Sequence, residues 1–141
     1  MDNLTSEQRK KTMTAVKSAG TRLERRFFNA LEEKGIQDIQ YHCKDVLGKP
    51  DIVHSPGRLV VFVDSCFWHG CSRHLRMPAS NVDYWRRKIA RNRKRDRLVN
   101  ERLKEEGWLV LRIWEHSIKN SRALKWWSTR ISGLIEARAS D

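Results

Sequence analysis

The chain lacks any long apolar segment, and it has few cysteines and few acidic residues. No apolar run approaches the roughly 20 residues that a membrane-spanning helix needs, and residues 1–17 are too polar for a secretory signal. We therefore expect a cytoplasmic protein without membrane contact. The three cysteines, Cys43, Cys66 and Cys71, are an odd number for disulfides in a reducing compartment, so they favour metal ligation or burial.

The shortage of acids leaves a strongly basic chain. Its 141 residues contain 29 Lys plus Arg against 17 Asp plus Glu, for a net charge of +12. An excess of this size favours a polyanionic partner, and nucleic acid is the commonest one for a soluble chain. The length fits one domain with one sizeable core, and neither an internal repeat nor a low-complexity linker divides it.

Apolar periodicity and turn residues predict a mixed α/β order. A capping pattern at Thr5 begins a polar, basic helix with too thin an apolar stripe for a core helix, and a second pattern at Thr21 begins an amphipathic helix that Gly35 ends. The further elements predicted are strands at about 39–43, 52–53, 59–63 and 108–114, a long helix at 80–106 and a final amphipathic helix that includes 124–135. This order predicts a single α/β domain over residues 21–141, in which helices flank a mixed central sheet, preceded by a basic helical arm over residues 1–20.

Two acids mark the predicted hairpin in residues 50–69, PDIVHSPGRLVVFVDSCFWH. Asp51 precedes its first strand and Asp64 closes its second. Carboxylates at the ends of paired strands can share one divalent cation, which makes a metal-dependent phosphodiesterase site one interpretation. A buried hairpin with a solvated turn acid is the other. His69, in the loop that follows, suits proton transfer to a scissile phosphate if it is more than an ordinary loop histidine.

Soft metal ligands follow the hairpin at once. Cys66, Cys71 and His74 are spaced C-x4-C-x2-H, and zinc takes four such ligands in a tetrahedron. We expect His116, just past the last strand, to be the fourth, because adjacent strands end side by side. Its rivals are His42, Cys43 and His69. The alternative is two buried thiols and a surface histidine.

Aromatic side chains divide into two sets. Phe67, Trp68 and Trp85 are predicted to be the least needed for packing, and in a basic protein they suit wedging between base pairs. The alternative is that Phe67 and Trp68 fold down onto the zinc loop. The remaining tryptophans are expected in the core: Trp108, Trp114, Trp126 and Trp127.

Charge on the long helix is concentrated in residues 86–97, where eight of twelve are Lys or Arg. At about 100° per residue these charges surround most of the helix, so they form either a solvated face or several phosphate contacts. The candidate DNA-binding residues are Arg86, Arg91, Arg93 and Arg95. Glu24 also has two interpretations, because the third residue after Thr21 completes a capping box, while an acid beside the hairpin can hold metal-bound water.

Several short motifs, in order over about residues 6–120, carry a resemblance to a known family. They are the run 50–74, then Pro78-Ala79, Tyr84-Trp85, Ile89-Ala90-Arg91-Asn92, Arg95-Asp96, Gly107-Trp108 and Trp114-Glu115. The chain thereby resembles the very-short-patch repair (Vsr) endonucleases, which are similar in fold to type II restriction endonucleases. Members nick DNA 5′ to the thymine of a T:G mismatch that arises when 5-methylcytosine deaminates.

The resemblance implies a role for each candidate. Asp51 would bind Mg²⁺ together with the backbone carbonyl of Val63, His69 would be catalytic, and Glu24 would be an acid near the site. Asp64 matches a position that is histidine in some members and acidic in others. The resemblance also implies intercalating aromatics at Phe67, Trp68 and Trp85, and structural Zn²⁺ on or near Cys66, Cys71, His74 and His116.

One departure from the family concerns that zinc set, because this chain has Trp114-Glu115-His116 where the family usually has Trp-Glu-Cys. The change keeps a metal ligand but alters its type. The basic arm matches one that closes over DNA, and the partners implied are duplex DNA with a T:G mismatch and mismatch-repair proteins. We expect a monomer associated with the nucleoid.

The expected function is therefore magnesium-dependent nicking at T:G mismatches, with a structural zinc. Two alternatives stay open from the residues alone. One is a restriction-type or defence nuclease of the same fold without mismatch preference, and the other is a zinc-stabilised DNA-binding module without activity.

Overall fold

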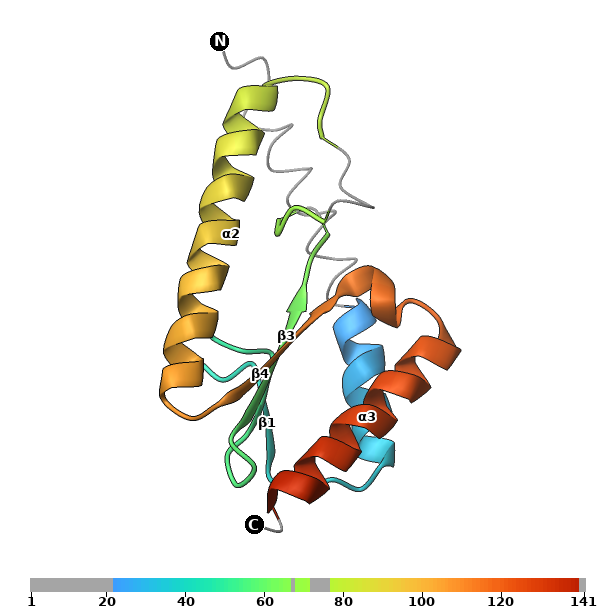
Figure 1. Cartoon of the computed structure of the whole chain (residues 1–141). Coiled ribbons are helices and arrows are strands. Elements are labelled where there is room, and N and C mark those ends of the chain that lie inside the picture. Colours follow the sequence, from blue (N-terminus) through green and yellow to red (C-terminus); the bar gives the residue numbers. More distant parts are fainter. Residues whose placement is uncertain (1–21, 67, 72–76, 140–141) are drawn as a thin grey trace.

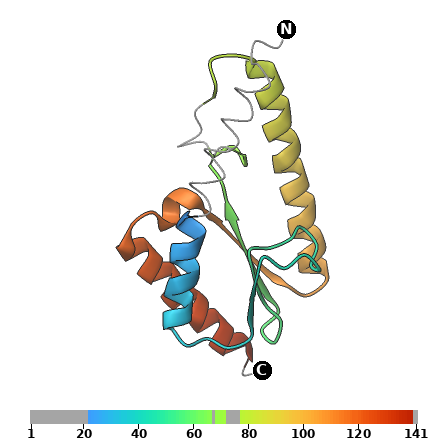
Figure 2. The same cartoon turned by 180° about the vertical axis from the view of Figure 1, so that it is seen from behind.

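A computed structural model describes residues 22–66, 68–71 and 77–139 of the chain. The predicted basic arm, Phe67 and His74 lie outside these residues. The described part forms three layers, with the long helix α2 (Val82–Glu105) on one face of a sheet and two helices on the other (Figures 1 and 2). These two are a helix at residues 22–33, blue in Figure 1, and α3 (Ser121–Ala139), red in Figure 1.

The sheet has four strands, in the order β1 (Ile39–Tyr41), β2 (Ile52–His54), β3 (Leu59–Asp64) and β4 (Leu109–Trp114). The first two pairings are antiparallel. The pairing of β3 with β4 is parallel, because α2 carries the chain back along the sheet between them. A mixed sheet between helices is therefore confirmed. The predicted bounds of the four strands and of the long helix lie within two residues of the observed ones.

Period-two alternation in β3 supplies both faces of the core. Val61 points with Phe27, Leu31 and Ile131 into the layer below helix 22–33 and α3. Phe62 points the other way. Its partners, with Val53 and Val60 from the sheet, include Leu103 of α2, so each face of the sheet buries a cluster of its own.

Gly70 fixes the loop after β3 against α2. Its φ of +67° is in the left-handed region, and a Cβ there would lie 2.6 Å from Cγ2 of Ile89. Both observations require glycine. The loop that carries Trp68 and His69 is thereby held against the long helix.

Two expectations about tryptophans are wrong. Trp85, predicted to be among the aromatics least needed for packing, is fully buried. Trp126, predicted to lie in the core, is 59% exposed on α3, because the apolar stripe of that helix runs through Leu124, Ile131 and Ile135. Within the described part of the chain, no helix combines the length and the apolar character that crossing a membrane requires.

A candidate active site and a Cys/His cluster

A pocket of about 460 Å³ lies between the sheet and α2. Its floor comes from β3, and α2 forms one wall. The loop after β3 contributes His69, and β4 contributes Arg112. The charged residues that line it are Lys49, Asp51, Asp64, Arg95, Asp96 and Arg112. Both acids of the predicted hairpin therefore face one pocket.

Asp51 belongs to a first group, with Glu24 and His42, whose ligand atoms all lie within 4.8 Å of one another. Nε2 of His42 is 3.5 Å from Oε2 of Glu24, and its Nδ1 is 3.9 Å from Oδ1 of Asp51. The backbone N–H of Val63 donates a 2.6 Å hydrogen bond to Oδ2 of Asp51. Helix 22–33, the end of β1 and β3 thus converge on one carboxylate pair.

Burial raises the pKa of both acids in this first group. The pKa of Glu24 rises from 4.5 to about 8, first through burial and then through the neighbouring charge of Asp51. Burial raises the pKa of Asp51 too, against the opposing hydrogen bond from Val63. Two desolvated carboxylates side by side are arranged to accept a cation. Glu24 therefore fits the metal-site interpretation, while its cap partner Thr21 lies outside the described residues.

A second group comprises Asp64, His69 and Asp96. Asp96, on α2, accepts a hydrogen bond from Nδ1 of His69, and Oδ1 of Asp64 lies 3.8 Å from the same nitrogen. Burial raises the pKa of Asp64, although His69 and Arg112 oppose the shift. The two carboxylates that were expected to share one cation, Asp51 and Asp64, are thus divided between two groups.

Arg112 joins the acids of the second group. Its Nη1 is 2.9 Å from Oδ1 of Asp64 and 3.5 Å from Oδ1 of Asp96. Its Nε donates a 2.6 Å hydrogen bond to Oδ1 of Asn100 on α2. The guanidinium also stacks over the ring of Phe62, with Cζ 4.0 Å from the centroid.

Three soft ligands converge beyond the end of β3. Nδ1 of His116 lies 3.3 Å from Sγ of Cys66 and 3.6 Å from Sγ of Cys71. Zinc bonds of about 2.3 Å to sulfur and 2.0–2.1 Å to nitrogen place tetrahedral ligands roughly 3.5 Å apart. The spacing fits zinc, and His74 lies outside the described residues.

The rivals for the fourth zinc position lie elsewhere. His42 belongs to the Asp51 group and His69 to the Asp64 group, while Cys43 is half-buried outside the cluster. Burial raises the pKa of the Cys66 thiol to about 11. A metal ion would favour the thiolate instead.

Trp68, in the loop after β3, packs on α2. The ring of Trp68 lies 5.8 Å from that of Trp85, and Nζ of Lys88 is 5.1 Å from the Trp68 centroid. Asn92 donates a 2.9 Å hydrogen bond to the backbone carbonyl of Trp68. Trp68 is partly exposed, so the fully buried Trp85 supports it from beneath. The candidate DNA-binding arginines, Arg86, Arg91, Arg93 and Arg95, are all exposed on α2.

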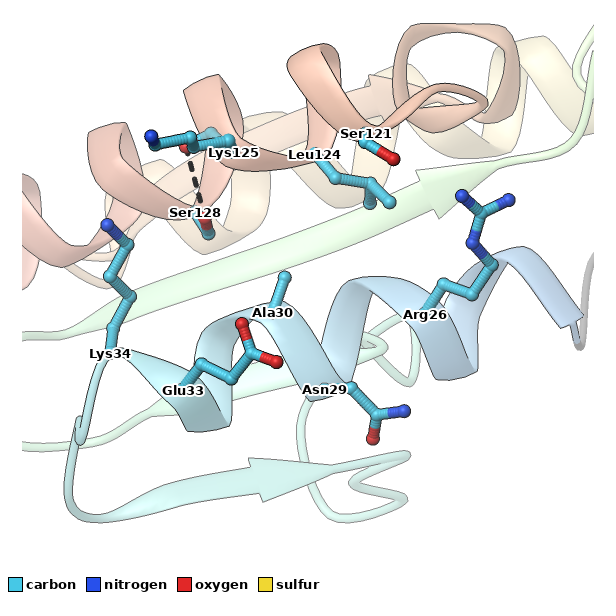
Figure 3. Close-up of a pocket in the computed structure, with 9 residues that line it drawn as sticks. All are labelled: Arg26, Asn29, Ala30, Glu33, Lys34, Ser121, Leu124, Lys125 and Ser128. Atoms are coloured by element: carbon cyan, nitrogen blue, oxygen red, sulfur yellow. Dashed lines mark hydrogen bonds between the residues drawn. The ribbon is translucent and has the colours of Figure 1, made fainter.

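Other cavities lack the chemistry of this pocket. One of about 490 Å³ lies between helix 22–33 and α3, with Arg26 and Lys34 toward its two ends and the Ser128 hydroxyl turned to the carbonyl of Lys125 (Figure 3). Another, of about 780 Å³, lies along the outer face of α3 beside Trp126. Among the described residues, neither contains a group of metal-ligating side chains.

The sequence analysis missed the roles of three residues in or beside the two acidic groups. His42 was considered only as a rival zinc ligand. Asp96 had a visible signal, since it is the only acid in residues 84–100. Arg112 had one as well, because it is the single charge in the apolar strand WLVLRIW.

Comparison with known proteins shows the family of the chain. The family model for DNA mismatch endonuclease Vsr matches residues 1–75. The Type II nicking enzyme V.XorIIP of Xanthomonas oryzae pv. oryzae is 39% identical over 88% of this chain and 91% of its own.

Two further relatives were found. The Type II nicking enzyme V.NaeI of Lentzea aerocolonigenes is 43% identical over 77% of this chain and 68% of its own. The DNA mismatch endonuclease Vsr of Escherichia coli K12 is 34% identical over 82% of this chain and 74% of its own. The chain therefore belongs to the DNA mismatch endonuclease Vsr family, which makes it a strand-nicking DNA hydrolase.

Proposed function

We propose that this enzyme cuts one DNA strand 5′ to the thymine of a T:G mismatch and that it requires Mg²⁺. The observation that carries the proposal is the pocket itself. Asp51, which is paired with Glu24, lines the pocket, and so do the hydrogen-bonded His69 and Asp96. Phosphodiester hydrolysis needs these two elements, a cation site and a proton acceptor.

The Asp51 side fits a hard divalent cation. Carboxylate oxygens are the ligands that Mg²⁺ prefers, and Asp51 and Glu24 supply them. Val63 donates its N–H to Asp51, and a strand residue turns its N–H and C=O toward the same neighbour. The carbonyl of Val63 is therefore directed to the same side, as the proposed ligand set requires. When bound, Mg²⁺ would neutralise charge that develops on the phosphate.

The His69 side handles the proton. Its Nδ1 is bound to Asp96, so Nε2 remains available to take a proton from the attacking water. Asp96 fixes the ring orientation and stabilises the protonated imidazole. His69 is thus the proposed general base, and Asp96 supports it. Asp64 and Arg112 line the same pocket.

Selectivity for a mismatch is proposed to arise from deformability. A T:G wobble stacks less well than a matched pair, so unstacking it costs less. Trp68, braced by Trp85, and its neighbour Phe67 would be the wedge, and the exposed arginines of α2 would hold the phosphates. Trp85 has no exposed surface, so its proposed contribution is support for Trp68.

The second metal ion proposed is structural zinc. Cys66, Cys71 and His116 supply three ligands at suitable separations, and His74 is the proposed fourth. A site closed by four protein ligands stabilises a fold and leaves no position for substrate. It would hold the Trp68 loop to the end of β4. Metal analysis should find one zinc per chain, lost in Cys71→Ser.

The deciding experiment compares labelled duplexes that differ only in one T:G or T:A pair, in several sequence contexts, with Mg²⁺ or EDTA. We expect a single-strand cut beside the thymine, only in the T:G duplex and only with Mg²⁺. Equal cutting of both duplexes would support the other candidate, a nuclease of this family without mismatch preference. Undiminished cutting in EDTA would refute the metal requirement.

A further inference from the structure

Arg112 is a partly buried cation that the proposed chemistry does not use. Only 17% of its side chain is exposed, and it lies on β4 directly opposite Phe62 of β3. Placing an unpaired charge there would be costly, and its neighbours remove that cost. The guanidinium forms ion pairs with two carboxylates, donates a hydrogen bond to one amide oxygen and stacks on one aromatic ring.

The arrangement of these partners is specific to arginine. Asp64 lies two residues beyond Phe62 on the same face of β3, and Asp96 and Asn100 lie one turn apart on α2. A planar fork with several donors can reach all of them at once, whereas a lysine ammonium is a single point charge. Arg112 therefore ties β3, β4 and α2 together at the wall of the pocket.

The same contacts govern His69. Its Nδ1 is bound to Asp96, yet Asp64 lies only 3.8 Å from that nitrogen and is a competing acceptor. Nη1 of Arg112 is nearer to Asp64, at 2.9 Å. The guanidinium thus engages Asp64 and leaves Asp96 as the partner of His69.

We propose that Arg112 is a positioning residue for the His69–Asp96 pair, that its guanidinium occupies the cation position between Asp64 and Asp96, and that Asp64 anchors Arg112 and binds no catalytic metal. The inference rests on the proposed role of His69. It separates the two acidic groups by function. The Asp51 group takes a metal ion from solution, whereas the Asp64 group contains its own cation.

Four variants test the inference: Arg112→Gln, Arg112→Lys, Asp64→Asn, and the double variant that combines Asp64→Asn with Arg112→Gln. Arg112→Gln should lower kcat by about 10–100-fold with little change in KM for DNA, because Asp64 then competes for His69. Arg112→Lys should recover part of this loss. Asp64→Asn alone should lower kcat by less than about fivefold, since Arg112 still holds Asp96. The double variant should recover at least about tenfold over Arg112→Gln, because the competing carboxylate is gone.

Arg130→Gln is the matched control. Arg130 is an exposed arginine on α3 and lies outside this pocket. This variant should leave kcat and KM for DNA nearly unchanged. Arg95 is a candidate phosphate contact, so Arg95→Gln should raise KM and lower the salt dependence of DNA binding more than it lowers kcat. The opposite split is expected for Arg112→Gln.

NMR of the ¹⁵N-labelled imidazole gives a readout that a merely structural role would not move. The Nδ1–H resonance of His69 should shift or broaden in Arg112→Gln and return in the double variant, in protein with zinc bound and an unchanged fold. An unchanged resonance together with an unchanged kcat would overturn the inference. A loss confined to KM would overturn it too, because Arg112 would then be a phosphate contact.

Two further results separate this inference from the proposed function. A loss of more than about 1,000-fold in Asp64→Asn, with weaker Mn²⁺ binding to the protein, would make Asp64 a metal ligand and refute the anchoring role. Full activity in His69→Ala would refute the proposed mechanism itself. Activity that is lost in His69→Ala but retained in Arg112→Gln would refute only the inference about Arg112.

Discussion

The two acidic groups each combine two carboxylates with a histidine, but only one of them is paired with an arginine. Glu24 and Asp51 face His42, and no Lys or Arg within the described residues forms an ion pair with them. Asp64 and Asp96 face His69 and share the guanidinium of Arg112. Burial raises the pKa of Asp51 and of Asp64 alike. Burial therefore does not distinguish the groups, and the presence of a resident cation does.

The comparison teaches how a carboxylate group in a nuclease can be assigned a function. A buried acid pair without a cation is costly in the free protein, and a metal ion relieves that cost when it binds. A pair that already holds arginine has no such need, so it is free to orient a histidine. Each prediction below changes one group and leaves the other intact.

The largest effect is expected for Asp51→Asn. Removing the charge should lower nicking by more than about 1,000-fold, because a metal contributes several kcal/mol to the transition state. DNA binding should persist, since the exposed arginines of α2 are untouched. Single-turnover nicking and a binding titration on the same duplex measure both. Equal losses of binding and cutting would contradict the assignment.

Asp96→Asn should have the next largest effect. General-base assistance is worth about 10²–10⁴-fold, and an amide orients His69 without stabilising the imidazolium, so we expect a loss of about 100-fold in kcat. The concentration of Mg²⁺ that gives half-maximal activity should stay the same. A large change in that concentration would indicate that Asp96 is a metal ligand. The two groups would then not differ in function.

Much of this fold and part of this pocket are predictable from the sequence. Strand alternation and capping residues identify the layers, and the turn between Asp51 and Asp64 brings both acids to one region. Which other acid lies beside Asp51, and which lies beside Asp64, is not predictable in this way. It depends on Glu24 from a helix and Asp96 from another, which approach through packing between elements distant in the sequence.

Arg112 and Trp126 both show that the contacts of a side chain depend on how the helices and strands pack. A charge in an apolar strand is legible in the sequence, but its partners on β3 and α2 are known only once the three elements meet. Trp126 looks like a core residue by its type, yet the helical stripe that packs excludes it. The type of a side chain indicates whether its burial is favourable. Its position around the helix or along the strand decides whether it faces the core.

The smallest effect is expected for Glu24→Gln on the stability of the protein without Mg²⁺. The pKa of Glu24 is about 8 in the fold and 4.5 otherwise, so the folded state binds the proton more tightly. The contribution of the Glu24 carboxyl to the free energy of unfolding is therefore fully present below about pH 4.5. It is lost as the pH rises through about 8. The glutamine variant escapes this loss.

In buffer without added Mg²⁺, Glu24→Gln should melt about 3–6 °C above the parent near pH 8, which corresponds to about 1–2 kcal/mol. The two proteins should melt at about the same temperature near pH 4.5. Glu33→Gln, exposed on the same helix, is the control and should show no such trend. Mg²⁺ should stabilise the parent more than the variant, because it removes the repulsion that the glutamine has already removed. A difference in melting temperature that does not change with pH would mean that ionising both Glu24 and Asp51 does not destabilise the fold. The proposed difference from the arginine-bound pair would then be refuted.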